Sequence, residues 1–248
     1  MNFKEQAKYL PLGKGVKIVA CDSNGVIALD KPEGILSHPN KDSEVNKSLL
    51  KAPYDSASQA YKVELEEGIQ KEIHLLNRLD SATSGLILLT LNELTRGPIL
   101  KAFENKAVKK TYEALVFGMP RKGNPLWKDR LSVRKAEGGV RASTGGTGNL
   151  GAETKLVRCK PIPGMPLLSL LTLMPLTGRT HQLRIQTSKR NIPIVGDRTY
   201  GDFQKNKSIA RAKGIKRLCL HCVSMELTYS YLGKKVGFKA LSPSPFKV

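Results

Sequence analysis

Acidic residues and long apolar runs are scarce in this sequence. Asp and Glu number 21 against 41 Lys and Arg, so the formal net charge is +20 over 248 residues. No apolar run approaches the ~20 residues that a membrane-spanning helix needs. The first ten residues mix charged with apolar side chains and contain no signal-peptide core. We therefore expect a soluble, cytoplasmic protein that does not use a membrane.

Cysteine and histidine are also few, with four of each. A chain of this length with four cysteines carries no disulfide framework. Cys219 and Cys222 form a C-x-x-C pair, but a metal site needs more ligands than this pair supplies, and the other two cysteines are distant in the sequence. We expect reduced, structural thiols and no metal.

The positive charge is spread along the whole chain rather than gathered in one cluster. Basic residues run from Lys4 to Lys247. A field of this sign and extent favours polyanions, and nucleic acid is the first partner to consider. An anionic metabolite would need only a local group of cations.

The hydrophobic content of 40% is enough for a substantial core. We expect residues 1–14 to be a lead-in and residues 15–248 to form a single domain, with a flexible excursion at about 119–151 that contains a short ribbon near 131–133. The turn residues Asp22 to Gly25 predict a hairpin between strands 16–20 and 26–29. Gly145 to Asn149 has loop composition and lacks the context of a phosphate-binding loop.

Periodicity predicts more strands than helices, joined mostly by short turns. The fold class is therefore α+β, with a mixed, mostly antiparallel sheet flanked by helices and loops. Thr177 is a candidate cap for the third expected helix, and Gly97 and Pro98 limit the start of the second. The expected helices are 55–68, 95–105 and 178–190, and the further expected strands are 85–91, 108–118, 153–159, 167–173, 218–222, 225–231 and 236–241.

Two polar stretches could carry chemistry. In Asn77-Arg78-Leu79-Asp80, a carboxylate stands just before the apolar run Gly85 to Leu89, where a buried strand would hold it rigidly. In the second stretch, Arg179, His181 and Arg184 come together on a predicted helix. From the residues alone, a surface ion pair and a solvated basic face remain open alternatives.

The first stretch resembles the active-site string of RluA-type pseudouridine synthases, His-Arg-Leu-Asp-x-x-Thr-Ser-Gly-Leu-Leu-Leu. Further segments are similar to that family's motifs in the same order, and the resemblance covers roughly residues 25 to 240. They are Asp30 to Pro39, Lys110 to Val116, Gly178 to Arg184 with Pro193 to Gly201, and Arg217 to Cys222.

The resemblance implies an isomerase that converts uridine to pseudouridine in structured rRNA or tRNA without a cofactor. It implies that Asp80 is the catalytic carboxylate, that Arg184 is its salt-bridge partner and that Tyr112 lies against the target base. A buried carboxylate needs such a partner to stay ionised. The implied RNA contacts are Arg78, Arg179, His181 and Thr83, with Arg179 an alternative partner for Asp80 and His181 a residue that holds the helix start.

The sequence departs from the family pattern at Asn77, where the family usually has His. The lead-in is also too short for the accessory RNA-binding domain of many relatives, so we expect a stand-alone catalytic domain. Because no strong apolar surface stripe is evident, we expect a monomer. The alternative function is a non-catalytic RNA-binding or ribosome-assembly factor on the same fold, and a carboxylate-dependent glycosidase or nuclease is weaker, since no second catalytic carboxylate or metal cluster is found.

Overall fold

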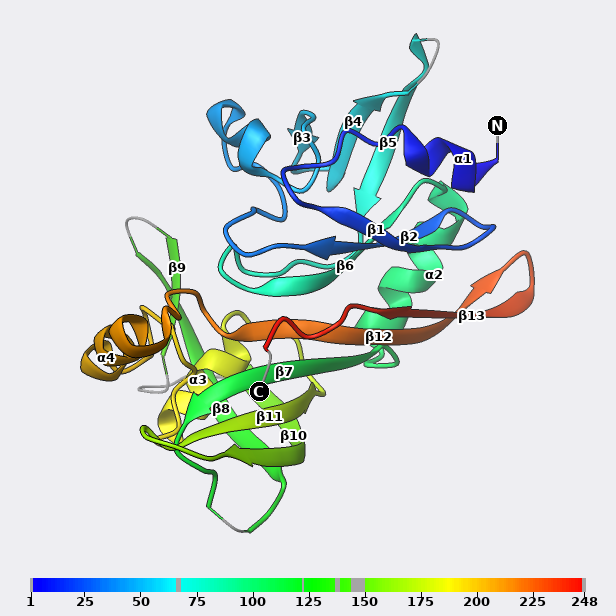
Figure 1. The fold of residues 1–248 in the computed structure, drawn as a ribbon. Helices are drawn as coiled ribbons and strands as arrows, with labels where there is room; N and C mark the ends of the chain where they lie inside the picture. Colours follow the sequence, from blue (N-terminus) through cyan, green and yellow to red (C-terminus); the bar gives the residue numbers. More distant parts are fainter. Residues whose placement is uncertain (1, 66–67, 122, 137–138, 144–149, 247–248) are drawn as a thin grey trace. The chain divides into compact units, whose positions relative to one another are not determined.

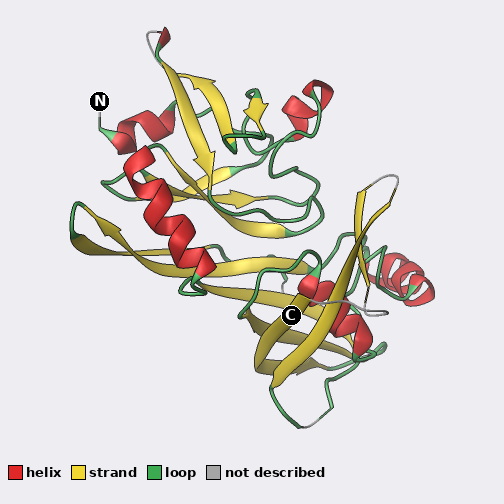
Figure 2. Cartoon of the chain, turned by 180° about the vertical axis from the view of Figure 1, so that it is seen from behind, coloured by secondary structure: helices red, strands yellow, loops and turns green. Residues whose placement is uncertain are grey.

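The computed structural model describes residues 2–65, 68–121, 123–136, 139–143 and 150–246. The chain folds into two compact units. Unit 1 consists of Met1–Lys109 and Cys222–Pro243, and unit 2 consists of Lys110–His221 and Ser244–Val248. Both units are built on β-sheet with a few helices (Figures 1 and 2). That they act as one domain stays a prediction.

Unit 1 is organised around strand β6 (Ser84–Thr90), all of whose residues are buried. β6 pairs antiparallel with β2 (Val26–Lys31) from Val26↔Thr90 to Lys31↔Gly85, and with β5 (Gln70–Leu75) at its other edge. β12 is also a neighbour of β6 in the sheet. The remaining strands of this unit are β1 (Lys17–Cys21), β3 (Tyr54–Asp55), β4 (Ala60–Glu64), β12 (Leu220–Tyr231) and β13 (Lys234–Leu241).

Gly85 in β6 is required by the close approach of β12. Its φ is +107°, and a Cβ atom at this position would lie 2.3 Å from the carbonyl oxygen of Cys222. Both the backbone conformation and the lack of space exclude any larger side chain. The glycine that precedes the apolar run therefore lets two strands meet.

The helices of unit 1 start at asparagine caps. Asn2 and Glu5 form a capping box at the start of α1 (Phe3–Lys8), and the Asn92 side chain accepts the Leu94 N–H at the start of α2 (Glu93–Glu104). Figure 2 shows α2 lying across one face of the unit 1 sheet. A short 3-10 helix, η1, spans Asp42–Lys47.

Unit 2 contains an antiparallel sheet in the order β7-β11-β10-β8-β9. Helix α3 (Gln182–Lys189) packs on it, where Ile185 joins Leu131 and Ala152 in a buried cluster against Tyr200. A second helix, α4 (Phe203–Lys213), follows. The strands are β7 (Lys109–Phe117), β8 (Leu126–Ala136), β9 (Gly139–Ser143), β10 (Leu150–Ile162) and β11 (Leu168–Pro175).

The fold class is confirmed as α+β with a mostly antiparallel sheet. The hairpin at Asp22 to Gly25 is also confirmed, because Asp22 Oδ1 accepts the N–H groups of Asn24 and Val26 at 2.9 Å and Gly25 has φ +89°. The expected strands at 85–91, 108–118, 153–159, 167–173 and 236–241 are confirmed within a few residues, and those at 218–222 and 225–231 are one continuous strand, β12.

The expected helix at 55–68 is wrong, since β3 and β4 occupy this segment. Tyr61 and Val63 are buried whereas Lys62 and Glu64 are exposed, which is the two-residue alternation of a strand. The short ribbon expected near 131–133 is confirmed, because β8 runs for 11 residues there and pairs antiparallel with β9, whereas the wider excursion at 119–151 stays a prediction. The glycine-rich segment 145–149 lies outside the described residues.

Two helix predictions need correction at their ends, and two helices were not predicted. Helix α2 begins at Glu93, and Pro98 lies inside it. Helix α3 begins at Gln182, and its N-cap is His181 rather than Thr177. The lead-in contains α1, and α4 was not expected at all, since its sequence FQKNKSIARAK has only one buried residue, Ile209.

Candidate active site

Asp80 lies in the short loop between β5 and β6, and backbone hydrogen bonds hold this loop. The N–H of Thr83 donates to the Asp80 carbonyl oxygen at 3.0 Å and closes a turn. Beside it, Leu79 N–H donates to Ser37 Oγ at 3.0 Å, and Ser37 Oγ donates to the Leu79 carbonyl oxygen at 2.6 Å. Asp80 itself is half-buried. The loop thus holds a carboxylate at the end of a buried strand.

Lys31 ties a second segment to the Asp80 loop. It is fully buried, and its Nζ donates to the carbonyl oxygens of Pro32 at 3.0 Å, Ile35 at 2.7 Å and Ser81 at 3.0 Å. The N–H of Gly34 also donates to the Ser81 carbonyl oxygen, at 2.8 Å. These bonds satisfy an ammonium group that would otherwise be costly to bury. Sequence reasoning assigned no role to Lys31, although a lysine inside a buried strand was a signal.

The Asn77 side chain serves the backbone of β6. Its Oδ1 accepts the N–H of Leu88 at 2.7 Å, while the N–H of Leu76 donates to the Leu88 carbonyl oxygen at 2.9 Å. This amide therefore continues the pairing between β5 and β6 up to the Asp80 loop. At the position where the family usually has histidine, the asparagine therefore holds the loop against β6 by a hydrogen bond to the backbone.

Arg78 and Thr83 flank Asp80 differently. Arg78 is exposed, and its Nη1 lies 3.5 Å from Nε2 of His38. The His38 ring stacks on Tyr54, with ring centroids 4.6 Å apart. Thr83 is 3% exposed, so its position in the loop is that of a packed side chain. Contact with RNA stays a prediction for both residues.

Arg184 lies on α3 and forms a buried bidentate pair with Asp197. Its Nε donates to Oδ2 at 2.8 Å and its Nη2 to Oδ1 at 2.9 Å. Burial alone would raise the pKa of Asp197. However, the Arg184 guanidinium and the N–H groups of Tyr200 and Thr199 outweigh it, so the pKa lies below its usual range. Asp197, which sequence reasoning did not select, therefore fixes the direction of the Arg184 fork.

Three other expected site residues lie in unit 2. His181, at φ 55°, donates to or accepts from Tyr200 Oη through its Nδ1 at 2.9 Å, and the Tyr200 ring lies 5.1 Å from the Arg184 guanidinium carbon. Tyr112 is 9% exposed on β7, opposite Leu173 of β11. Arg179 is exposed, and its Nε donates to the Gly151 carbonyl oxygen at 3.3 Å.

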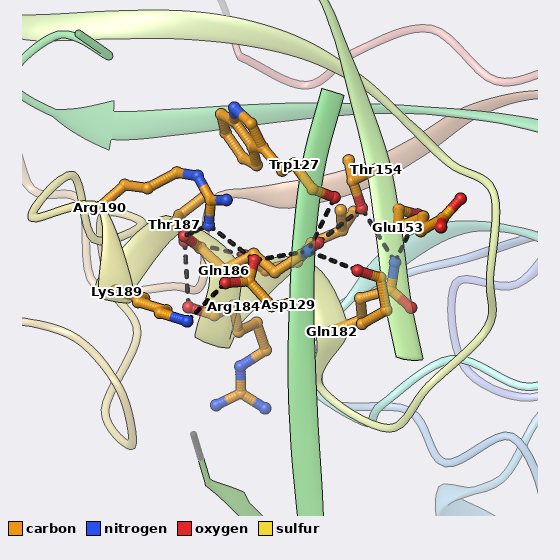
Figure 3. A network of polar contacts seen from close by, with 12 residues as sticks. Trp127, Asp129, Glu153, Thr154, Gln182, Arg184, Gln186, Thr187, Lys189 and Arg190 are labelled. Atoms are coloured by element: carbon orange, nitrogen blue, oxygen red, sulfur yellow. Dashed lines mark hydrogen bonds and ion pairs between the residues drawn. The ribbon is translucent and has the colours of Figure 1, made fainter. Parts of the chain in front are cut away.

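A buried polar network fixes α3 to the sheet (Figure 3). Asp129 of β8 accepts from Gln186 Nε2 at 2.9 Å, Lys189 Nζ at 2.7 Å and Arg190 Nη1 at 2.8 Å. Gln186 Oε1 also accepts the hydroxyl of Thr154 on β10 at 2.6 Å. Burial would raise the pKa of Asp129, but its hydrogen bonds to Lys189, Gln186 and Arg190 outweigh burial and lower it. Figure 3 shows Arg184 extending away from this network.

The expected site residues form two groups. Arg78, Asp80 and Thr83 belong to unit 1, and the other four belong to unit 2. Within unit 2 the structure brings Arg184, His181, Tyr200 and Asp197 together. The pairing of Asp80 with Arg184 stays a prediction.

The described ranges of the chain hold neither a metal-ligand cluster nor a membrane-spanning helix. These residues contain no cluster of three or more His, Cys, Asp or Glu side chains that could hold a metal ion. No helix in the described part of the chain is long and apolar enough to cross a membrane. Cys219 and Cys222 are buried and form no disulfide within the described part of the chain.

Comparison with known proteins gives one consistent result. A family model described as RNA pseudouridylate synthase matches residues 25–189. A tRNA pseudouridine synthase C from Pasteurella multocida is 31% identical over 211 residues, which cover 82% of this chain and 82% of that protein. A ribosomal large subunit pseudouridine synthase C from Rickettsia bellii is 30% identical over 227 residues, which cover 91% of this chain and 68% of that protein.

The solved structures agree on the fold. The human RNA pseudouridylate synthase domain containing 1 protein superimposes with a TM-score of 0.66 and 23% identity, over 94% of this chain and 85% of the other. The human RNA pseudouridylate synthase domain containing 4 protein superimposes with a TM-score of 0.64 and 20% identity, over 98% of this chain and 91% of the other. At such identities the likeness concerns the fold alone.

Proposed function

The chain belongs to the RNA pseudouridylate synthase family, and we propose that it uses Asp80 to isomerise uridine to pseudouridine in a structured ribosomal or transfer RNA. The observation that carries this proposal is the Asp80 loop, whose backbone and adjoining strand are fixed by the side chains of Ser37, Lys31 and Asn77. Preorganised groups of this kind need little rearrangement during a reaction. Relatives named for tRNA and for the large ribosomal subunit support both RNA classes.

In the proposed reaction, ionised Asp80 attacks the uridine nucleotide and the N-glycosidic bond breaks. The uracil then turns in place and its carbon 5 forms the new bond to the sugar. The bond to Asp80 breaks, and N1 gains a proton in place of the one lost from carbon 5. The overall change is an isomerisation, so no redox partner or group donor is needed. Asp80 is the nucleophile and must be charged to act.

Arg184 is the proposed partner that keeps Asp80 ionised once RNA has excluded water from the site. Asp197 supports this role, because its two hydrogen bonds to Nε and Nη2 fix the orientation of the guanidinium. Arg179, which contacts a carbonyl oxygen, is the alternative partner. Tyr112 is proposed to lie against the target base.

The target nucleotide must leave its stack before it reaches Asp80, which costs a few kcal/mol. Phosphate contacts from a chain of net charge +20 offset this cost. Arg78, Thr83 and His181 are proposed to border the flipped nucleotide. We also propose that the protein acts as a monomer in the cytoplasm.

The first experiment is a pseudouridine map of total RNA from cells with and without this gene. A site lost with the gene identifies the substrate, and the purified protein should restore it on a transcript. Asp80→Asn and Asp80→Ala should then lower turnover by at least about a thousandfold, as expected for a covalent nucleophile, with RNA affinity within a few-fold of wild type.

The matched control is Asp42→Asn, which removes an exposed carboxylate in η1 of the same unit and should keep full activity. Full turnover by Asp80→Asn would overturn the role of Asp80. If no pseudouridine site depends on the gene while ribosome assembly does, the non-catalytic RNA-binding function replaces the proposal.

A further inference from the structure

Helix α4 presents an unusual exposed face. Phe203, Lys207 and Arg211 follow one another at intervals of four residues, so they line up along one side of the helix. Phe203 is 80% exposed, and Lys207 and Arg211 are exposed as well. We call these three residues the α4 stripe. At 1.5 Å per residue, the stripe spans about 12 Å.

The exposure of Phe203 calls for an explanation. Large aromatic side chains normally contribute buried area to a core or an interface. Of the described Phe, Tyr and Trp side chains, Phe203 is the most exposed at 80%, and Tyr9 follows at 43%. An aromatic ring held in solvent at the start of a helix is a surface on which a partner can stack.

The charge of α4 indicates which partner this is. The helix contains Lys205, Lys207, Arg211 and Lys213 and no acidic residue. Lys205 is engaged by the N-cap Asp202 at 3.4 Å. By contrast, no described carboxylate forms an ion pair with Lys207 or Arg211. The stripe therefore combines an aromatic ring with two cations, which suits a base and its neighbouring phosphates.

The opposite face of α4 is firmly docked. Ile209 is fully buried, and Asn206 accepts the Gly196 N–H at 2.8 Å and donates to the Asp197 carbonyl oxygen at 2.9 Å. Since Asp197 also holds Arg184, the hydrogen bonds of Asn206 join α4 to the residue that positions the proposed catalytic arginine. The stripe is thus a rigid surface attached to the same segment of unit 2.

We propose that the α4 stripe binds a single-stranded segment of the RNA substrate, with a base stacked on Phe203 and phosphates bound by Lys207 and Arg211. The proposal rests on the proposed function, because it assigns a second contact to the same RNA. Single strands expose the face of a base, whereas duplexes do not. The stripe would therefore favour substrates that contain a single-stranded segment.

The test measures equilibrium binding of the full-length protein to two fluorescein-labelled probes. One probe is a single-stranded oligouridylate, and the other is the same strand annealed to its complement. Phe203→Ala should weaken single-strand binding about 5- to 100-fold, with little effect on duplex binding and no change in the salt dependence. Lys207→Ala with Arg211→Ala should reduce the slope of log affinity against log salt by about 1.4, or about 0.7 for each phosphate contact.

Matched controls lie on unit 1. Leu94→Ala removes another exposed apolar side chain from a helix, and Lys234→Ala with Lys235→Ala removes two exposed cations from β13. These variants should bind both probes like wild type except for a small, general loss. Because all the substituted side chains are exposed, melting temperatures should stay near that of wild type and show that the variants fold.

Two results would overturn the inference. In the first, the stripe variants bind both probes no worse than the controls, which would leave this face as a surface for docking another protein. In the second, Phe203→Ala leaves the affinity for the single strand unchanged, which would make this face a phosphate contact alone. Both results concern binding alone and leave the role of Asp80 untouched. Conversely, full turnover by Asp80→Asn would reject the proposed chemistry without affecting the binding measured here.

Discussion

Arg184 is held by two different kinds of contact, a carboxylate fork and an aromatic ring. Asp197 binds it through two hydrogen bonds, and Tyr200 lies 5.1 Å from its guanidinium carbon. The Asp197 carboxylate is itself bound by two backbone N–H groups at 2.9 Å. Charge-assisted bonds of this kind fix a planar group more strictly than a single contact does.

The Asp197 carboxylate should make stability depend on pH. Its pKa is lowered in the folded state, because Arg184 and backbone donors favour the ionised form more than burial opposes it. The stabilisation is therefore complete above the unfolded-state pKa of about 3.9 and is lost as pH falls through the lower folded-state value. Asp197→Asn should reduce the free energy of unfolding at pH 7 by about 3 kcal/mol, since it breaks a buried pair, and should flatten this acid dependence.

Urea unfolding at a series of pH values measures both effects. Glu226→Gln is the control, because it breaks an exposed pair with Lys239 and should change stability little. An Asp197→Asn protein that lost stability below pH 4 as steeply as wild type would show that other carboxylates, such as Asp129, dominate the acid response.

At the scale of elements, the position of α3 depends on Gln186. This side chain is fully buried and joins α3 to Asp129 on β8 and to Thr154 on β10. Gln186→Ala would remove one hydrogen bond from each of these groups and create a cavity, so it should lower the free energy of unfolding by about 3 kcal/mol. Because α3 carries Arg184, turnover should fall more than RNA affinity.

The control for Gln186→Ala is the same substitution at Gln204, an exposed residue of α4. Urea unfolding and single-turnover kinetics at a temperature where both variants are folded compare the two. Equal turnover in the folded Gln186→Ala protein would mean that the network stabilises unit 2 without positioning Arg184.

A second element-scale prediction concerns the contact of β6 with β12. Gly85→Ala would place a methyl group 2.3 Å from the Cys222 carbonyl oxygen at φ +107°. We expect a loss of more than about 3 kcal/mol or no folded protein, because both a backbone strain and a clash arise. Gly97→Ala is the control, since no atom lies within 4 Å of its Cβ position and it sits inside α2, where alanine should stabilise the helix by about 0.5–1 kcal/mol.

Thermal melts of the two alanine variants distinguish them. A Gly85→Ala protein that melted near the wild-type temperature would show that β12 can shift away from β6 at little cost. In that case the close contact of the two strands would not be essential to the sheet.

For the whole molecule, the net charge of +20 predicts a strong dependence of RNA binding on salt. A protein that contacts six or more phosphates should lose about a thousandfold or more in affinity between about 50 and 200 mM salt. Filter binding of a ribosomal RNA fragment over this range measures the slope. An affinity that did not change with salt would contradict RNA binding through a basic surface. Contacts to the uncharged bases would instead show as residual affinity that no longer falls at high salt.

Much of the fold followed from patterns that are local in the sequence. The Asp22 to Gly25 turn and the apolar run of β6 were predicted because short-range conformation and alternation determine them. The segment of β4 was predicted as a helix, although Tyr61 and Val63 alternate with charged residues. Helix α4 was missed because most of its side chains are exposed and its sequence lacks an apolar stripe.

The sequence by itself determined the family, through the ordered motifs around Asp80, Tyr112 and Arg184, and also the basic charge that favours RNA. These features depend on residue identity and local spacing. Only the tertiary structure decided that Asn77 supports β6, that Asp197 holds Arg184 and that Asp129 meets Gln186 from 57 residues away. The reason is that the folded path of the backbone decides which distant side chains lie within hydrogen-bonding distance. Residue type alone does not distinguish the Asp or Gln that forms such a pair from others in the sequence.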